Sequence, residues 1–337
     1  MPRYLDDAQR DAIQDQRASW RWRSEWPTWI VIVAAHGGWF AVATNAHALG
    51  LPLALGLLAV LSCWYMSLQH ELLHGHPTRW PFVNMLFGFA PLAVWFPYAV
   101  YRESHLRHHD DAHLTVPGRD PESYYVTPAQ WSSAGAVLRA ALAARNTFVG
   151  RMLIGPWFAI AASWREAAMA VANGEWRIVG SWATHVAALA ALAWWLDARC
   201  AIPWRAFIFG VGYAALALTS VRSFHEHRAT GDERERTVIN EAAWPWRLLF
   251  LNNNYHAVHH DLPGVPWFAL GAIYRARREA YRASNGGFVV RGYGEWIARH
   301  AFLRTVSPVH PLAGQTDAAV SAGKPANALL ALRKPRP

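Results

Sequence analysis

Three histidines lie within the stretch Asn252-Asn253-Asn254-Tyr255-His256-Ala257-Val258-His259-His260-Asp261-Leu262-Pro263, at the spacing His-x-x-His-His. The stretch His105-Leu106-Arg107-His108-His109 repeats that spacing, and His70-Glu71-Leu72-Leu73-His74 adds a pair four residues apart. Positions i, i+3 and i+4 share one face of an α-helix, so each stretch can aim two or three imidazoles at one point. A single pair of this kind is commonly incidental. Three of them in one chain predict a shared metal centre.

The number of histidines indicates more than one ion. These three stretches hold eight candidate ligands, whereas a zinc site normally takes four. Imidazole also suits Fe, Cu or Ni, so the ligand type does not choose the metal. A further ligand is expected where a later apolar run ends, and of His225 and His227, which point to different faces of a helix, we favour His227. The predicted ligands are His70, His74, His105, His108, His109, His227, His256, His259 and His260.

Polar neighbours are expected to accept the outer N–H of the ligand imidazoles and so fix their tautomers. Acidic residues near the stretches equally offset the charge of nearby arginines, so both interpretations stay open for each. The candidates for this supporting role are His76, His113, His225, Glu71, Glu226, Asn252 and Asp261. Packing or hydrogen bonding is expected of His36, His47 and His185, and exposure to solvent is expected of His300 and His310.

The composition is that of a polytopic membrane protein, with 53% hydrophobic residues, 16% charged residues and 20 tryptophans. The net charge of +9 comes almost wholly from arginines dispersed between apolar runs. This pattern fits the positive-inside bias of membrane proteins better than a nucleic-acid surface. Cys63 and Cys200 share no motif, so neither a disulfide framework nor a cysteine metal site is expected. The first residues show no cleavable signal peptide.

Four apolar runs have about the length that crosses the hydrocarbon layer. They cover residues 29–49, 53–69, 178–196 and 204–221, and they predict two helical hairpins. The turn near Gly50 has no Lys or Arg, whereas the chain on the other side of the hairpin has many. The histidine ends and both termini are therefore expected in the cytoplasm.

Residues 81–100 are also apolar, but a full crossing would place His105 about 30 Å from His70. Pro81, Pro91 and Pro97 interrupt a helix, so we interpret the segment as interfacial or re-entrant. Residues 134–172 mix apolar residues with arginines at helical intervals, which predicts amphipathic helices lying on the surface. The predicted organisation is a cytoplasmic arm over 1–28, a catalytic domain over 29–275 and a basic C-terminal region over 276–337, with a tail disordered from Val306.

The three histidine stretches resemble the histidine boxes of the membrane fatty acid desaturase superfamily, over residues of about 29–263. The continuation His74-Gly75-His76-Pro77 and the Asn-Asn-Asn-Tyr lead into the third box resemble a bacterial branch, which also includes enzymes acting on small amino-acid-like molecules. The resemblance implies an all-α integral membrane protein whose four transmembrane helices carry a cytoplasmic cap around two irons. It also implies that the nine histidines named above are the iron ligands.

The implied reaction is an O2-dependent oxidation of an unactivated C–H bond. Desaturation of a fatty acyl chain in lipid metabolism is favoured, and hydroxylation of a lipid, alkane, carotenoid or small amino-acid-like molecule is the alternative. The chain has no haem or ferredoxin motif, so a separate electron donor of the ferredoxin, rubredoxin or cytochrome type is expected. The implied location is a bacterial inner membrane, with no nucleic-acid partner. Two classes compete with this function: a histidine-rich metal transporter or sensor, and a haem-bearing electron carrier.

Overall fold

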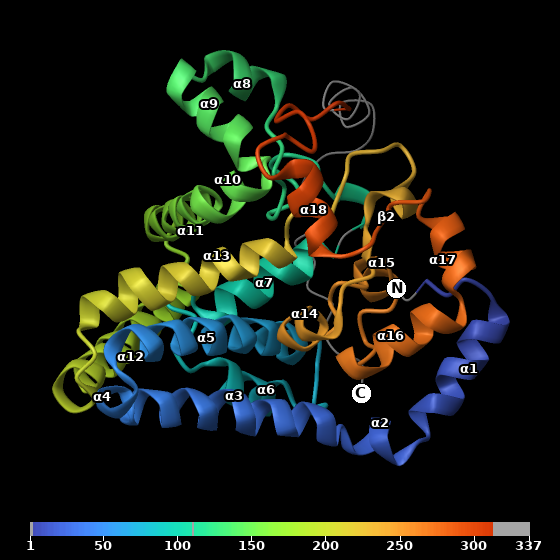
Figure 1. Cartoon of the computed structure of the whole chain (residues 1–337). Coiled ribbons are helices and arrows are strands. Elements are labelled where there is room, and N and C mark those ends of the chain that lie inside the picture. Colours follow the sequence, from blue (N-terminus) through green and yellow to red (C-terminus); the bar gives the residue numbers. More distant parts are fainter. Residues whose placement is uncertain (1–2, 110, 313–337) are drawn as a thin grey trace.

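The computed structural model describes residues 3–109 and 111–312 (Figure 1). The helices of its first third are α1 (Asp7–Arg17), α2 (Trp20–Ser24), α3 (Trp26–Thr44), α4 (Ala46–Leu49), α5 (Leu51–Leu73), α6 (Pro81–Gly88) and α7 (Tyr98–His108). The middle of the chain forms the 3-10 helix η1 (Asp111–His113), then α8 (Pro128–Ser133), α9 (Ala136–Arg145), α10 (Phe148–Leu153), α11 (Gly155–Ala172), α12 (Trp176–Cys200), the π-helix η2 (Ala206–Val211) and α13 (Gly212–Arg222).

The last part of the described chain contains short elements. These are η3 (Glu233–Arg236), β1 (Ile239–Asn240), α14 (Trp244–Leu249), α15 (His256–Asp261), α16 (Trp267–Ala276), α17 (Arg278–Ser284), β2 (Val289–Val290) and α18 (Tyr293–His300). The two strands pair in parallel, with Ile239 opposite Val289. The predicted all-α class is therefore correct apart from this two-residue ladder.

The first two predicted spans correspond to α3 with α4 and to α5, and α3 packs against α5. Gly50 has a φ of 80° and Pro52 lies in the first turn of α5, so the chain reverses sharply and restarts as a helix. The 23 residues of α5 extend about 34 Å, enough to cross the hydrocarbon layer. Its last seven residues are all buried, and they include His70 to Leu73 of the first histidine stretch. Figure 1 shows α14 to α18 gathered at this end.

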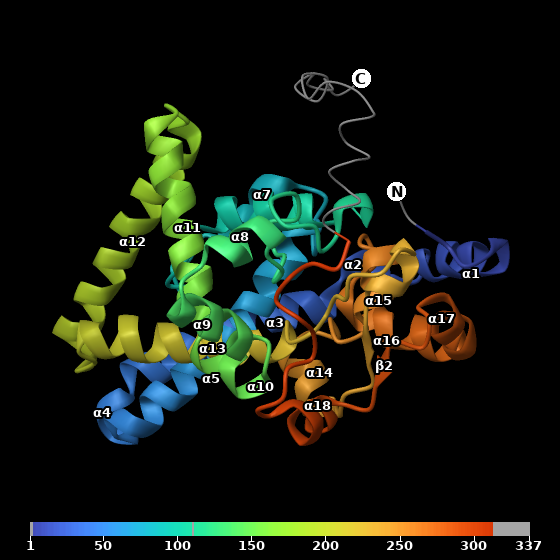
Figure 2. The same cartoon turned by 90° about the horizontal axis from the view of Figure 1, so that it is seen from above.

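Three helical stretches of the described chain are long and apolar enough to cross a membrane: Trp20–Thr44, Leu51–Leu73 and Trp176–Cys200. The fourth predicted span is a shorter apolar helix, Ala206–Arg222, which begins with the π-helical turn. The second predicted hairpin is not a closely packed pair, because α12 packs mainly on α11 and α3 and at most weakly on α13. In Figure 2, α11 and α12 lie side by side across the end of α13. The fourth span and the second hairpin therefore stay predictions.

The apolar segment before the second histidine stretch contains only one helix of eight residues, α6, which is too short for a crossing. Polar side chains of α5 hold the end of α6. Tyr65 Oη donates to the Gly88 carbonyl at 2.6 Å, and Gln69 Nε2 donates to the same oxygen at 2.8 Å. The segment then turns back into α7, which packs against α5. This path supports the interpretation that the segment returns to the side it left.

Residues 134–172 correct the prediction of helices lying wholly on the surface. Arg165 is exposed on α11, but Arg145 and Arg151 are only 8% and 4% exposed. Both turn inward because the ring of Tyr124 stacks against their guanidiniums, with Arg151 Cζ 3.4 Å from the ring centroid.

The chain after Val306 is ordered as far as residue 312, since the Val126 N–H donates to the Pro308 carbonyl and the His310 N–H donates to the Val126 carbonyl. His310 is 4% exposed, which corrects its prediction as a solvated residue. The rest of the predicted tail lies outside the described residues.

Candidate metal centre

The nine histidines predicted as ligands come together at the buried end of α5, where they form two groups. The five-histidine group contains His70, His74, His105, His109 and His259. The four-histidine group contains His108, His227, His256 and His260. Within each group the candidate ligand nitrogens lie within 4.8 Å of one another. The sequence clusters thus meet in space, and each group has the size of a site for one ion.

Helix geometry explains how the two His-x-x-His-His stretches are divided. Residues i and i+4 are rotated by about 40° from each other, whereas i+3 points to the other side of i. On α7, His105 and His109 accordingly enter the five-histidine group and His108 enters the other. On α15 the division is reversed. His259 lies in the five-histidine group, whereas His256 and His260, four residues apart, lie in the four-histidine group. Each stretch therefore bridges the two groups and fixes their separation.

The distances between ring nitrogens fit a shared ion. His109 Nε2 lies 3.1 Å from both His105 Nε2 and His259 Nε2, and His227 Nε2 lies 3.1 Å from both His108 Nε2 and His256 Nε2. Two nitrogens bound at about 2.1 Å to one ion lie about 3.0 Å apart in octahedral geometry and about 3.4 Å apart in tetrahedral geometry. The observed separations match this range.

One further ring nitrogen points to the same conclusion. His74 Nε2 is buried and has no hydrogen-bond partner among the described residues. A buried polar atom without a partner is costly, and a bound cation would satisfy it. The donor set therefore fits two metal ions of the kind that imidazole prefers.

Carboxylates and an amide hold the outer nitrogens of three histidines. His105 Nδ1 lies 2.8 Å from Glu122 Oε1, and His108 Nδ1 lies 2.8 Å from Asp120 Oδ1. The amide oxygen of Asn253 lies 3.0 Å from the Nδ1 of the third, His256. An Nδ1–H donated to these oxygens leaves the Nε2 lone pair free for a metal.

The electrostatics keep most of the imidazoles neutral. Burial and the neighbouring imidazoles lower the pKa of His109, His227, His256 and His259 well below its usual value, so their lone pairs are available at neutral pH. His108 differs from them. Burial lowers its pKa, but the nearby carboxylates outweigh burial and raise the pKa to about 9.

Glu122 and Glu226 lie beside the histidines with opposite shifts. Burial raises the pKa of Glu122, but His108 and His105 outweigh burial and hold the pKa below its usual range. Burial raises the pKa of Glu226 to about 7, although Arg222 opposes the shift. Glu122 therefore carries a negative charge that would compensate part of the charge of two cations.

Two of the predicted supporting residues lie against the centre. Glu71 Oε1 is 3.6 Å from His70 Nδ1, and its other oxygen accepts the N–H of Trp267 at 3.0 Å. Glu226 Oε2 is 3.8 Å from His256 Nε2. Glu71 is thus near an outer ring nitrogen, as a supporting residue would be, whereas Glu226 is near the ring nitrogen that faces the other histidines.

Other predicted supporting residues have different partners. His76 Nδ1 lies 2.6 Å from Glu25 Oε1, so it joins the first histidine stretch to the N-terminal chain. His225 has a φ of 54° and packs its ring between Phe288 and Trp296. The backbone turn at His225 directs its ring away from the metal groups, whereas His227 enters one of them, as favoured from the sequence.

Asn252, Asp261 and His113 hold the backbone around the centre. The Asn252 side chain donates to the Trp267 carbonyl at 2.9 Å, so it stabilises the turn before α15. The Asp261 carbonyl accepts the N–H of Arg3 at 2.7 Å, and the His113 carbonyl accepts the N–H of Val116 at 3.0 Å.

Three groups that support the histidines were missed from the sequence: Asp120, Glu122 and Asn253. Asp120 lies 12 residues beyond His108 in the sequence, outside the second histidine stretch. For Asn253 a signal was available, because the run Asn252 to Asn254 precedes the third stretch. The sequence could not say which of these asparagines faces the histidines.

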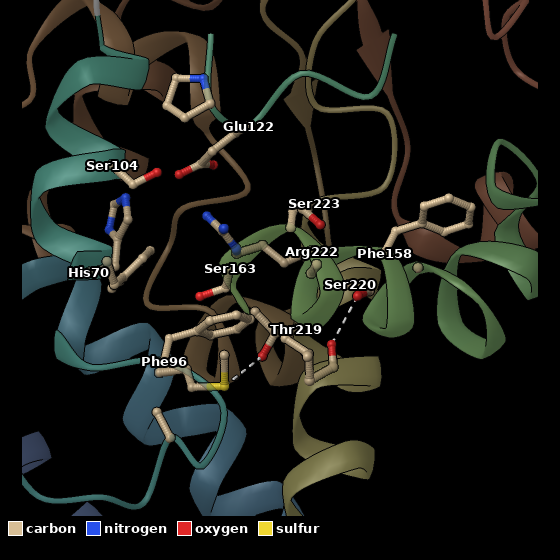
Figure 3. Close-up of a pocket in the computed structure, with 18 of the residues that line it drawn as sticks. His70, Phe96, Ser104, Glu122, Phe158, Ser163, Thr219, Ser220, Arg222 and Ser223 are labelled. Carbon is tan, nitrogen blue, oxygen red and sulfur yellow. Dashed lines mark hydrogen bonds between the residues drawn. The ribbon is translucent and has the colours of Figure 1, made fainter. Parts of the chain in front are cut away.

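A cavity of about 270 Å³ begins at the metal groups. His70, Glu122 and Asn253 form its wall on that side, and Met66, Phe96 and Leu216 are among its apolar residues. Figure 3 shows the guanidinium of Arg222 pointing from α13 toward the side where His70, Ser104 and Glu122 lie. The cavity can therefore hold a small molecule against the centre.

The fold and the centre define a class of protein: a helical membrane protein with two buried histidine groups beside a substrate-sized cavity. The family model for fatty acid desaturase matches residues 43–292, more than half of the 337-residue chain. The chain therefore belongs to the fatty acid desaturase family, whose members are membrane oxidoreductases of the desaturase and hydroxylase type. No curated protein matches the sequence significantly.

Proposed function

We propose that the protein is a membrane-bound, O2-dependent oxidoreductase that binds two irons and desaturates a fatty acyl chain. The observation that carries the proposal is the division of nine histidines into two adjacent groups at one wall of a cavity. The family supports an acyl substrate and a membrane location. Two bound irons would supply the O2-dependent oxidation of a C–H bond, which no side chain can perform alone.

The residues of the chain have three tasks in this function. The histidines hold the ions through Nε2, while Asp120, Glu122 and Asn253 fix three of the imidazole rings in the tautomer that binds metal. The cavity orients the substrate carbon beside His70. Burial of the histidine groups limits the access of bulk water to the centre.

Hydroxylation of a lipid, alkane, carotenoid or small amino-acid-like molecule is the second candidate. The polar and charged lining of the cavity favours it, because an acyl chain alone needs only apolar walls. Mass spectrometry of lipids and polar metabolites from cells with and without the protein separates the two reactions. Loss of two hydrogens from the product supports desaturation, and gain of one oxygen supports hydroxylation.

The electron donor in this proposal is a separate protein of the ferredoxin, rubredoxin or cytochrome type. The positive charge of the chain favours an acidic partner, whose association would then weaken at high salt. We place the centre and both termini at the cytoplasmic side of a bacterial inner membrane, on the basis of the arginine distribution.

The test is metal analysis of the purified protein together with the variant His259→Ala. About two Fe per chain, with loss of iron and of product in the variant, is expected. His47→Ala is the matched control, because His47 is exposed and lies outside both histidine groups. Zn alone would support the transporter or sensor, and a haem absorption band would support the electron carrier. Full product formation by His259→Ala would refute the proposed centre.

A further inference from the structure

The cavity has a second charged region besides the metal groups. Arg145 and Arg151 line it together with Arg222, and all three guanidiniums are at least nine-tenths buried. Burying a charge is costly unless a counter-charge or hydrogen bonds compensate it. Three buried cations around one small cavity therefore need an explanation.

The compensation within the chain is incomplete. Arg222 Nη1 lies 3.6 Å from Glu226 Oε1. Among the described residues, no carboxylate oxygen lies within 4.0 Å of Arg145 or Arg151 in an ion pair. Their contacts are to backbone carbonyls and to the rings of Tyr124, Phe158 and Phe224. Arg151 Nη1 and Arg145 Nε are buried and have no hydrogen-bond partner within the described chain.

The two guanidiniums remain charged at neutral pH. Burial lowers the pKa of Arg145 to about 10, which is still well above neutrality. Arg151 is held by a hydrogen bond from its Nε to the Arg145 carbonyl at 3.1 Å and by its stacking on Tyr124. Its free Nη1 is thus fixed in position before any ligand arrives, which lowers the entropic cost of binding.

We propose that Arg151 and Arg145 bind the carboxylate of the substrate, so that the enzyme acts on a free carboxylic acid and not on a thioester or a phospholipid. A guanidinium presents a planar fork of donors that matches a carboxylate. The cavity volume of about 270 Å³ lies near the lower limit for small-molecule pockets, and a thioester or an ester would bring no free carboxylate to the two guanidiniums. The apolar residues Met66, Phe96 and Leu216 face the hydrocarbon part of such an acid.

This inference rests on the proposed function in one respect: it takes the bound acid to be the substrate of the oxidation. Binding itself is tested with the full-length, metal-loaded protein in detergent, by thermal unfolding with sodium hexanoate and with methyl hexanoate. Hexanoate is expected to raise the midpoint of unfolding and the ester is not. Equal stabilisation by the ester would overturn the proposal. Stabilisation by inorganic phosphate without stabilisation by hexanoate would overturn it as well, since the site would then belong to a phosphate group.

Variants locate the binding site. Arg151→Gln is expected to weaken hexanoate binding by about tenfold to a hundredfold, and Arg151→Lys, which keeps the charge without the fork, by less. Arg165→Gln on the exposed face of α11 is the matched control and keeps wild-type binding. Unchanged binding in a folded Arg151→Gln protein would refute the assignment. If that variant does not fold, the comparison of hexanoate with its ester in the wild type decides.

The metal content separates this inference from the proposed function. Arg151→Gln is expected to keep the iron of the wild type, since Arg151 is in neither histidine group. A protein without iron that still binds hexanoate through Arg151 would refute the proposed function and leave the carboxylate site standing. A protein that holds two irons but binds hexanoate no better than its ester would refute the carboxylate site and leave the proposed function standing.

Discussion

Replacing Asp120 by asparagine is expected to weaken one of the two metal positions and to leave the other intact. The Asp120 carboxylate is 5% exposed and has three partners: His108 Nδ1 at 2.8 Å, the Thr115 N–H at 2.9 Å and the Glu122 N–H at 2.8 Å. An amide offers one oxygen where the carboxylate offers two. Its NH2 group must therefore face either the Thr115 N–H or, in the other orientation, both the imidazole and the Glu122 N–H.

The size of the effect follows from this geometry. If the amide nitrogen faces His108, Nδ1 becomes the acceptor and the proton moves to Nε2, which can then no longer bind a metal. Removal of such a partner costs about tenfold to a hundredfold in metal affinity, or about 1.4 to 2.7 kcal/mol. If the amide faces the backbone N–H instead, a buried donor loses its acceptor at a cost of about 1–3 kcal/mol in stability.

The assay is a chelator titration of the purified protein, with iron counted at each step. The wild type is expected to release two irons, and Asp120→Asn to release one of them at a tenfold to hundredfold lower chelator concentration. Asp232→Asn is the matched control, because Asp232 is exposed and its carboxylate accepts the N–H of Arg234. Wild-type release of both irons by a folded Asp120→Asn protein would refute the reasoning. Equal weakening of both irons would show that the two groups do not bind ions independently.

Three other predictions, tested with four variants, probe separate parts of the structure. Asn253→Ala is expected to weaken iron binding about tenfold, because Asn253 holds His256. Asn252→Ala is expected to lower the unfolding temperature and to leave the iron content unchanged. Equal iron loss in both variants would contradict these different roles of the two asparagines. Leu270→Ala removes a fully buried side chain and is expected to lower the free energy of unfolding by about 2–5 kcal/mol in denaturant titrations. The hydrogen bond from Arg278 lowers the pKa of Glu241 from its usual 4.5, so this pair stabilises the fold above that value and loses its effect as the pH falls below it. The difference in unfolding temperature between the wild type and Glu241→Gln should therefore shrink from about pH 7 to about pH 4, and a constant difference would exclude this role.

Local helix geometry lets the sequence predict which histidines lie on one face. The spacing of His105, His108 and His109 specifies a helical face whatever the rest of the chain does, and the same holds for the third stretch. Two such faces and the pair at the end of α5 have few ways to share a site. His227, and not His225, lies in one of the two histidine groups, and the physical basis is a left-handed backbone at His225 that no pattern of residue types predicts.

The supporting groups could not be predicted because their partners are distant in the sequence. Asp120 and Glu122 reach α7 from a loop whose path is set by turns and not by hydrophobic periodicity. Among the asparagines before α15, the φ of 55° at Asn252 turns its side chain toward the Trp267 carbonyl and leaves Asn253 to face the histidines. Neighbouring residues in a turn can thus point in unrelated directions, whereas on a helix the direction of a side chain follows from its position in the sequence.

The burial of the arginines of α9 and α10 could not be predicted from the sequence for a different reason. Arginines at helical intervals predicted amphipathic helices lying on the surface, where water is the usual partner of a charge. Water and an anionic ligand satisfy the same donors, however, so the pattern of residue types is identical for a surface and for a binding cavity. What distinguishes them is the neighbouring chain: the Tyr124 ring and α13 cover Arg151 and remove it from solvent. A buried cation without an acidic partner indicates a ligand of opposite charge. For Arg151 the expected ligand is therefore an anion, the carboxylate proposed above.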